Sequence, residues 1–304
     1  MLSDFISEIQ RLNKEAETVR FQNPERALEL AKEAERLAQE QGEKAGLAES
    51  LTIIADVYWR TERYAEGINA ARKALTLFTM LNDIHGEART LNLIGVFHGE
   101  LGEINDALQA YQKSLKCAET IGEKKGMAYT FNNIAALFIK LTDYATAIDI
   151  LLKSLTLFQE ISDRYGEALV RINIGNIYQF NQECENALKE YQAALAIYES
   201  MGLKREIAIV LENIGILFKK LTDYENAQCS LEKALRLYEE LNLLNSIAKV
   251  KHNLAAVYED KGEDEKAIQL YSESLAIGEQ VSNKILVAGA CLNLGRLYSK
   301  KAKD

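Results

Sequence analysis

The sequence contains little of what interrupts helices, with one proline and 17 glycines in 304 residues. Proline and glycine mark turns, and a fold rich in sheet needs many of them, so their scarcity indicates a helical protein. No apolar run reaches the ~18 residues that cross a bilayer, which argues against an integral membrane protein. The first residues lack the basic and then apolar stretch of a secretory signal, so we expect a cytoplasmic protein.

Basic residues are also scarce relative to acidic ones. The chain has 36 Lys and Arg against 45 Asp and Glu, a formal net charge of −9. A protein that binds the phosphate backbone of nucleic acid needs a row of basic residues, and the sequence shows none. We therefore do not expect nucleic acid as a partner. The four cysteines are scattered without a Cys-x-x-Cys pair, which is typical of small apolar residues in a reducing compartment rather than of a disulfide framework.

What the sequence does contain is a 40-residue repeat in seven copies. The copies stay in register without insertion or deletion, and one column is wholly alanine: Ala48, Ala88, Ala128, Ala168, Ala208, Ala248 and Ala288. Apolar residues such as Phe131, Ile134 and Phe138 step by three and four, which predicts one face of an α-helix. Thr142 or Asp143 is then a natural cap for a second helix. A residue suited to the left-handed conformation ends most second helices: Gly42, Asn82, Gly122, Gly202 and Asn242. Ser162 and Ser282 fill this column in the other two copies.

Small and large residues alternate between columns in a way that favours paired helices. Gly95 in a first helix and Ala107 in a second let the two approach closely, and residues such as Tyr111 fill the surrounding space. One helical hairpin cannot bury both of its faces, so each copy must stack on the next. We therefore predict an all-α fold, an α-solenoid of stacked antiparallel helix pairs with one continuous core.

This arrangement resembles the tetratricopeptide repeat. The family's pattern of small and aromatic residues is matched by Gly175 and Tyr178 in the first helix, and by Ala187, Tyr191 and Ala194 in the second. The resemblance covers residues 44–300 directly and residues 23–41 as a second helix without a regular partner. The period is 40 residues, against about 34 in most members, and the family's closing proline is missing. In both respects the sequence is similar to the subclass of kinesin light chains, cell-polarity adaptors and bacterial regulators.

The ends of the sequence suggest a division into three parts. We expect a capping helix in residues 1–22 and a repeat array in residues 23–283, with a half repeat and then six helix pairs starting near residues 44, 84, 124, 164, 204 and 244. Residues 284–304 form an unpaired first helix. No second helix follows to cover four of its apolar residues, Leu286, Leu294, Leu297 and Tyr298. We therefore expect that the polypeptide continues or that another chain, such as a second copy, packs there.

The resemblance implies that the first helices line an inner, concave groove. One column expected there is asparagine in five consecutive copies: Asn133, Asn173, Asn213, Asn253 and Asn293. An amide offers both a donor and an acceptor, so it can pair with the backbone of an extended peptide. In the resembling proteins, asparagines of this column hold peptide backbones. The alternative is that each amide bridges adjacent helices and only fixes their stacking.

Further polar residues surround this column. The remaining candidate groove residues are Asn132, Asn176, Arg89, Lys140, Lys219 and Lys249. They make the groove mixed to mildly basic on an acidic protein, which favours an acidic or amphipathic peptide; the alternative is a merely solvated surface. A family clamp for peptide carboxylates is not expected, because Ile172 and Asn253 stand where the clamp has cations.

No pattern indicates catalysis, a cofactor or a metal. The three histidines lie in different columns, no spacing is typical of a metal site, and no phosphate-binding loop is present. His98 takes an aromatic packing position, so we expect it in the core. We therefore expect a non-enzymatic scaffold that binds a peptide or partner segment in its concave groove. The alternative is the N-terminal sensory or regulatory region of a larger bacterial signalling protein, with a cyclase, kinase or transcription regulator as its output.

Overall fold

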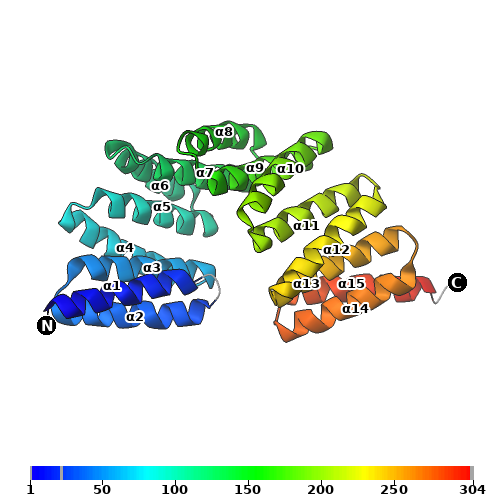
Figure 1. Ribbon diagram of the computed structural model, residues 1–304, viewed down its shortest axis with the longest axis horizontal. Helices are drawn as coiled ribbons and strands as arrows, with labels where there is room; N and C mark the ends of the chain where they lie inside the picture. Colours follow the sequence, from blue (N-terminus) through cyan, green and yellow to red (C-terminus); the bar gives the residue numbers. More distant parts are fainter. Residues whose placement is uncertain (1, 21–22, 302–304) are drawn as a thin grey trace. The chain divides into compact units, whose positions relative to one another are not determined.

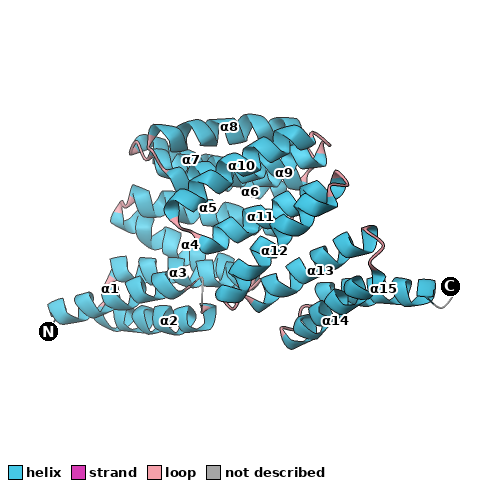
Figure 2. Cartoon of the chain, turned by 45° about the vertical axis from the view of Figure 1, so that its right-hand side comes forward, coloured by secondary structure: helices cyan, strands magenta, loops and turns pink. Residues whose placement is uncertain are grey.

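The computed structural model describes residues 2–20 and 23–301. In this part the chain forms fifteen α-helices and no strand, as predicted (Figures 1 and 2). The chain divides into two compact units, Met1–Asp163 and Arg164–Asp304. Unit 1 contains α1 (Leu2–Val19), α2 (Pro24–Gln41), α3 (Lys44–Arg60), α4 (Tyr64–Leu81), α5 (Ile84–Glu100), α6 (Ile104–Thr120), α7 (Lys124–Lys140) and α8 (Tyr144–Glu160). Unit 2 contains α9 (Arg164–Phe180), α10 (Cys184–Met201), α11 (Lys204–Lys220), α12 (Tyr224–Glu240), α13 (Leu244–Asp260), α14 (Asp264–Gln280) and α15 (Lys284–Lys301).

Each odd-numbered helix from α1 to α13 packs against the even-numbered helix that follows it. Within each unit, successive pairs then pack on one another, for example α4 on α5 and α12 on α13. Helix α2, for which the sequence shows no regular partner, pairs with α1 through the buried side chains of Ile9, Leu12 and Ala16. The stacking of helix pairs is that of an α-solenoid.

The turns use left-handed backbone in two columns. The column predicted to end the second helices has positive φ in all seven copies, from 53° at Asn82 to 68° at Gly42. A second such column, which the sequence analysis did not predict, lies between the two helices of each pair and includes Thr142 with φ 59° and Gly102 with φ 77°. Asp143 is the cap that follows, because its Oδ1 accepts a hydrogen bond from the Thr146 backbone N–H at 3.2 Å.

The predicted small residues lie where paired helices cross most closely. A Cβ added to Gly95 would stand 2.5 Å from the ring of Tyr111, and one added to Gly175 would stand 2.7 Å from the ring of Tyr191. Both tyrosines are buried on the second helix of the pair. The aromatic side chain therefore occupies the volume that a side chain on the first helix would need, and only a small residue is accommodated there.

The expectation of one continuous core along the whole array stays a prediction. The buried side chains form distinct clusters within the units, such as one centred on Tyr191 and Tyr198 and another on Leu231 and Tyr238. This follows from the repeat, since each helix pair buries its side chains mainly against its neighbours. The three-part division at residues 22 and 283 stays a prediction.

The last helix, α15, buries most of the face that the sequence analysis expected to be exposed. Leu286, Leu294 and Leu297 are buried, the last two in a cluster with Tyr271 of α14, so among the four predicted residues only Tyr298 is exposed. The exposed face instead has four more members: Ala288, Cys291, Leu292 and Gly295. In the six preceding copies the alanine of this column is at most 3% exposed, because a second helix covers it. None of the helices in the described part of the chain is long and apolar enough to cross a membrane.

Candidate functional site

The predicted asparagine column lies at the middle of five first helices. Asn133 is on α7 of unit 1, and the other four are on α9, α11, α13 and α15 of unit 2. All five are partly buried. The backbone positions each amide through the helical period, because the residue that directly follows each asparagine, such as Ile214 after Asn213, is buried.

Three of these amides bridge consecutive first helices. In each case the partner stands 41 residues earlier in the chain. Asn133 Nδ2 donates to Asn92 Oδ1 at 3.1 Å, and Asn253 Nδ2 donates to Glu212 Oε1 at 3.1 Å. Asn293 Nδ2 lies 3.3 Å from His252 Nε2. These contacts fix the stacking of neighbouring pairs, which is the alternative that the sequence analysis left open for this column.

The contact of Asn293 depends on a neutral imidazole. Burial lowers the pKa of His252, so the ring is held uncharged at neutral pH. A neutral ring leaves one nitrogen without a proton, and Nε2 can then accept the hydrogen bond from the Asn293 amide. Asn173 also has an interaction partner, as has the buried Asn132.

Asn213 differs from the rest of the column. The residue 41 positions before it is Ile172, which is apolar and 9% exposed. Within the described part of the chain the Asn213 amide therefore has no hydrogen-bond partner. Two exposed side chains lie beside it on the first-helix face: Ile209, one turn earlier on α11 and 37% exposed, and Lys249, at the same repeat position on α13. We call Ile209, Asn213 and Lys249 the Asn213 face.

The carboxylate of Glu212, which is partly buried, directly precedes Asn213 in the sequence. Burial raises the pKa of Glu212, and the Tyr238 hydroxyl and Lys249 oppose that rise. The Tyr238 hydroxyl donates to Glu212 Oε2 at 3.2 Å, while the Asn253 amide donates to the other oxygen. Both carboxylate oxygens are thus held by the protein, so Glu212 positions its neighbours and is not available to an incoming ligand.

Most of the predicted cations are paired with an acidic residue of a neighbouring repeat. Arg89 Nη2 lies 2.9 Å from Glu49 Oε2, Lys140 Nζ lies 2.7 Å from a Glu100 oxygen, and Lys219 Nζ lies 2.9 Å from an Asp260 oxygen. Among the predicted site residues that the structure describes, Lys249 is the one cation without an ion pair. Its charge nevertheless acts on the nearby carboxyl of Glu212, where it opposes the rise in pKa that burial causes.

Asn176 has a structural contact rather than an open amide. Its Oδ1 accepts a hydrogen bond from the Tyr191 hydroxyl at 2.7 Å, and that hydroxyl also lies 2.9 Å from Gln179 Oε1. The two side chains give the buried Tyr191 ring its polar partners. Asn176 therefore holds the second helix α10 in place.

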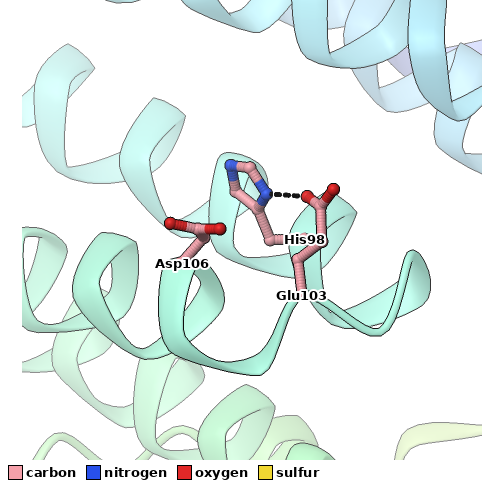
Figure 3. A group of neighbouring side chains, drawn as sticks. All are labelled: His98, Glu103 and Asp106. Atoms are coloured by element: carbon pink, nitrogen blue, oxygen red, sulfur yellow. Dashed lines mark hydrogen bonds and ion pairs between the residues drawn. The ribbon is translucent and has the colours of Figure 1, made fainter.

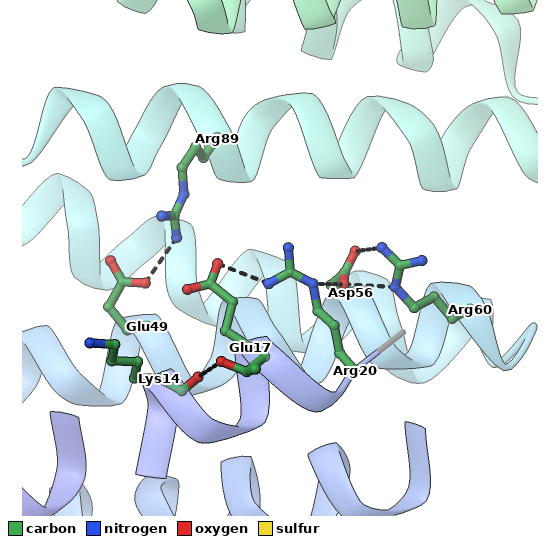
Figure 4. A network of polar contacts seen from close by, with 8 residues as sticks. Lys14, Glu17, Arg20, Glu49, Asp56, Arg60 and Arg89 are labelled. Atoms are coloured by element: carbon green, nitrogen blue, oxygen red, sulfur yellow. Dashed lines mark hydrogen bonds and ion pairs between the residues drawn. The ribbon is translucent and has the colours of Figure 1, made fainter. Parts of the chain in front are cut away.

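A network in unit 1 includes residues that the sequence analysis missed (Figure 4). Asp56 accepts a hydrogen bond from Arg60 on its own helix at 2.9 Å, and it forms an ion pair at 3.2 Å with Arg20, which directly follows α1. Both guanidiniums are about one-fifth exposed. Helix α1 lies outside the repeat columns, so no column pattern could have brought Arg20 to Asp56. The bridging contacts of Asn92, Glu212 and His252 were also missed, although their spacing of 41 from the asparagines was a usable signal.

Comparisons with known proteins place this geometry in a family. The tetratricopeptide repeat profile matches residues 46–120, 86–160, 126–200 and 166–240, and a second profile of the same repeat matches residues 252–285. These matches cover more than half of the chain, which belongs to the tetratricopeptide repeat family. The resemblance seen in the sequence is thereby confirmed. A search of curated proteins found no match.

Solved structures with the same fold include signalling proteins. A signal-transduction ATPase (STAND protein) with a tetratricopeptide repeat sensor from Pyrococcus horikoshii is 17% identical with a TM-score of 0.74, over 97% of this chain and 46% of that one. A Rap protein complexed with competence and sporulation factor is 17% identical with a TM-score of 0.70, over 90% of this chain and 76% of that one. The Rap conjugation gene regulator of plasmid pLS20, in complex with the Phr* peptide, is 15% identical with a TM-score of 0.69, over 92% and 76%. At these identities the likeness shows the fold.

Proposed function

We propose that this protein is a non-enzymatic interaction scaffold that binds an extended peptide or partner segment along the first helices of unit 2, at the Asn213 face. The observation that carries the proposal is the Asn213 amide, which has no partner in the described chain while three amides of its column bridge neighbouring helices. An unengaged amide can donate to a peptide carbonyl and accept from a peptide N–H. The Rap regulator complexed with the Phr* peptide, a protein of similar fold, supports this class of ligand.

The chemistry of the face favours an acidic peptide with an apolar side chain. Each hydrogen bond to the peptide contributes about 1 kcal/mol net, whereas micromolar affinity needs roughly 8 kcal/mol. The remainder must come from apolar contact, for which Ile209 is exposed, and from charge, for which Lys249 has no ion pair among the described residues. The Asn213 amide then sets the register of the backbone, and the flanking side chains give the selectivity.

Selection from a random peptide library tests this proposal. Peptides enriched on the wild-type protein should be acidic, and their affinity should fall with added salt. Lys249→Gln should weaken binding several-fold, whereas Lys219→Gln, which removes a lysine already paired with Asp260, should have little effect. Failure to enrich any peptide sequence, or equal losses in the two variants, would count against a site at the Asn213 face.

A second candidate function is the sensory or regulatory region of a larger signalling protein. The Pyrococcus horikoshii protein favours it, because its repeat sensor is part of a chain about twice as long as the region matched. Sequencing the coding region past Asp304 tests it. An output domain such as a cyclase, kinase or transcription regulator would support this function, and a stop codon directly after Asp304 would contradict it.

We also propose that α15 provides a surface for self-association. Its exposed face has Gly295 midway between Leu292, 74% exposed, and Tyr298, 55% exposed. Two antiparallel copies crossing at Gly295 would bring Leu292 of each opposite Tyr298 of the other, so the face is complementary to itself. Sedimentation at increasing protein concentration should show dimers that Leu292→Ser and Tyr298→Ser together remove. A wild-type protein that stays monomeric throughout would contradict this.

A further inference from the structure

His98, Glu103 and Asp106 come together at the turn between α5 and α6 in unit 1 (Figure 3). Each offers one potential metal-ligand atom, and these atoms lie within 4.8 Å of one another. His98 Nδ1 and Glu103 Oε2 are 2.5 Å apart. The His98 side chain is 11% exposed and fixed by its packing, whereas the Glu103 side chain is 49% exposed and Asp106 is also exposed. One ligand is thus rigid and two can adjust.

The other copies of the repeat show that this set of residues is unusual. The position of His98 holds an aromatic ring in each of them: Tyr58, Phe138, Tyr178, Phe218, Tyr258 and Tyr298. In four other copies the positions of Glu103 and Asp106 are occupied by side chains that bond to each other. Arg63 and Glu66 form an ion pair at 2.9 Å, as do Glu263 and Lys266 at 2.6 Å. The Asn186 amide donates to Glu183, and the Asn226 amide donates to Asp223.

Only in the copy with the histidine are both of these positions acidic. Two carboxylates three residues apart in the first turn of a helix repel each other. Glu103 makes no side-chain cap to α6, and Asp106 has no partner within the described part of the chain. This copy thus has two carboxylates where other copies have side chains that bond to each other, and an imidazole lies beside the carboxylates. No described residue forms a hydrogen bond with the second nitrogen of that imidazole.

We propose that His98, Glu103 and Asp106 bind a divalent transition-metal ion and thereby join α5 to α6. One imidazole nitrogen and two carboxylate oxygens suit Zn²⁺ and similar ions, with water in the open position. Ligand atoms around such an ion stand about 3.3–3.6 Å apart at the usual bond lengths. The exposed Glu103 and Asp106 side chains reach that geometry by small rotations, while His98 stays in place. The ion neutralises the repulsion between the carboxylates.

Titration of the chelator-stripped protein with Zn²⁺ tests this site. The repeat itself supplies variants that fold, since His98→Phe restores an aromatic residue found in other copies and Asp106→Asn restores the asparagine of two others. We expect one Zn²⁺ per chain in the wild type, and affinity at least about tenfold weaker in each variant. His85→Gln is the matched control, because His85 contacts a single carboxylate, Glu123, at 3.0 Å. It should bind Zn²⁺ as the wild type does.

Three outcomes would overturn the proposal. The first is a wild-type protein that binds no Zn²⁺. The second is a His98→Phe variant that keeps the wild-type affinity, which would assign the ion to other groups such as the free thiols. The third is displacement of Zn²⁺ by Mg²⁺ to the same degree in the wild type and in His98→Phe. Mg²⁺ prefers oxygen ligands in octahedral geometry, so that result would indicate a site without the imidazole.

Discussion

At the scale of single residues, the role of an amide in this protein depends on what stands 41 positions before it. Asn133, Asn253 and Asn293 follow polar residues and bridge to them, whereas Asn213 follows Ile172. The same residue type in the same column therefore has two uses. All of these amides are partly buried. One that has a partner stabilises stacking, and one without a partner can still form a hydrogen bond.

The left-handed turn residues give a prediction about stability. Thr142 has φ 59°, a conformation that costs a β-branched residue roughly 1–2 kcal/mol and glycine much less. Thr142→Gly should therefore raise the free energy of unfolding by about 1 kcal/mol after the entropy cost of glycine is subtracted. The reverse change in the preceding copy, Gly102→Thr, should lower it by a similar amount. Thermal unfolding that shows both variants destabilised would contradict this account of the turn.

Glu212 gives a prediction about pH. Burial raises its pKa, so the charged form is disfavoured in the folded protein and the residue reduces stability above the usual pKa of a carboxyl. This cost disappears as the pH falls through the raised value. Glu212→Gln removes the charge, keeps an oxygen for Asn253 and offers an N–H to the Tyr238 hydroxyl. We expect the variant to be the more stable at about pH 7, with the difference closing toward about pH 4. A difference that widens on acidification would show that the charged carboxylate stabilises the fold.

At the scale of helices, the unit of structure is a pair that crosses at a small residue. Gly95 and Gly175 each face a tyrosine ring of the paired helix. Helix α15 has the same column but no second helix among the described residues, and a Cβ added to Gly295 would meet nothing within 4 Å. Comparing a glycine that faces a paired helix with Gly295, which does not, separates the packing role of glycine from its low helix propensity.

This contrast predicts opposite effects for one substitution. Gly175→Leu should lower the free energy of unfolding by about 1–3 kcal/mol or more, because the new side chain overlaps Tyr191. Gly295→Leu should leave stability unchanged or raise it by up to about 1 kcal/mol, because leucine is the better helix former. Chemical denaturation of both variants measures this. Equal destabilisation would mean that the crossing is not the reason for glycine in this column.

The helices, their pairing and the first column of left-handed turns could be predicted from the sequence, because each is recorded seven times in one register. The second left-handed column could not, since Glu62, Thr142 and Gln182 carry no common signal of positive φ. The packing of Leu294 and Leu297 against α14 was also missed. A repeat position that is apolar in every copy indicates burial, but it does not indicate which helix buries the side chain. The ion pair of Arg20, directly after α1, with Asp56 involves a residue outside the repeat altogether.

For the candidate site, the sequence placed the named side chains on first helices but did not show their contacts. Its list of cations was correct as a list of side chains on the first helices, yet Arg89, Lys140 and Lys219 are paired with neighbouring repeats. Ion pairing between copies depends on the rotation from one pair to the next, which no single copy records. His98 is buried as expected for an aromatic position, and its contact with Glu103 arises from the turn that follows.

At the scale of the whole molecule, a strict repeat gives the tetratricopeptide array a uniform framework on which single departures become visible. Ile172 before Asn213, and the histidine with two acidic residues at α5 and α6, are two such departures. Uniform copies satisfy their own polar groups, so function is expected where a copy leaves a group unsatisfied. This is why we propose the Asn213 face, rather than the whole asparagine column, as the binding site.

One comparison tests that claim most directly: peptide affinity and stability measured together in Asn213→Ala and Asn253→Ala. With a peptide selected on the wild type and followed by fluorescence anisotropy, Asn213→Ala should weaken binding about tenfold and leave the unfolding temperature unchanged. Asn253→Ala should lower stability by about 1–3 kcal/mol, because it leaves the buried Glu212 oxygen without its donor, and should affect binding far less. An Asn213→Ala protein that binds the peptide as tightly as the wild type would contradict the account.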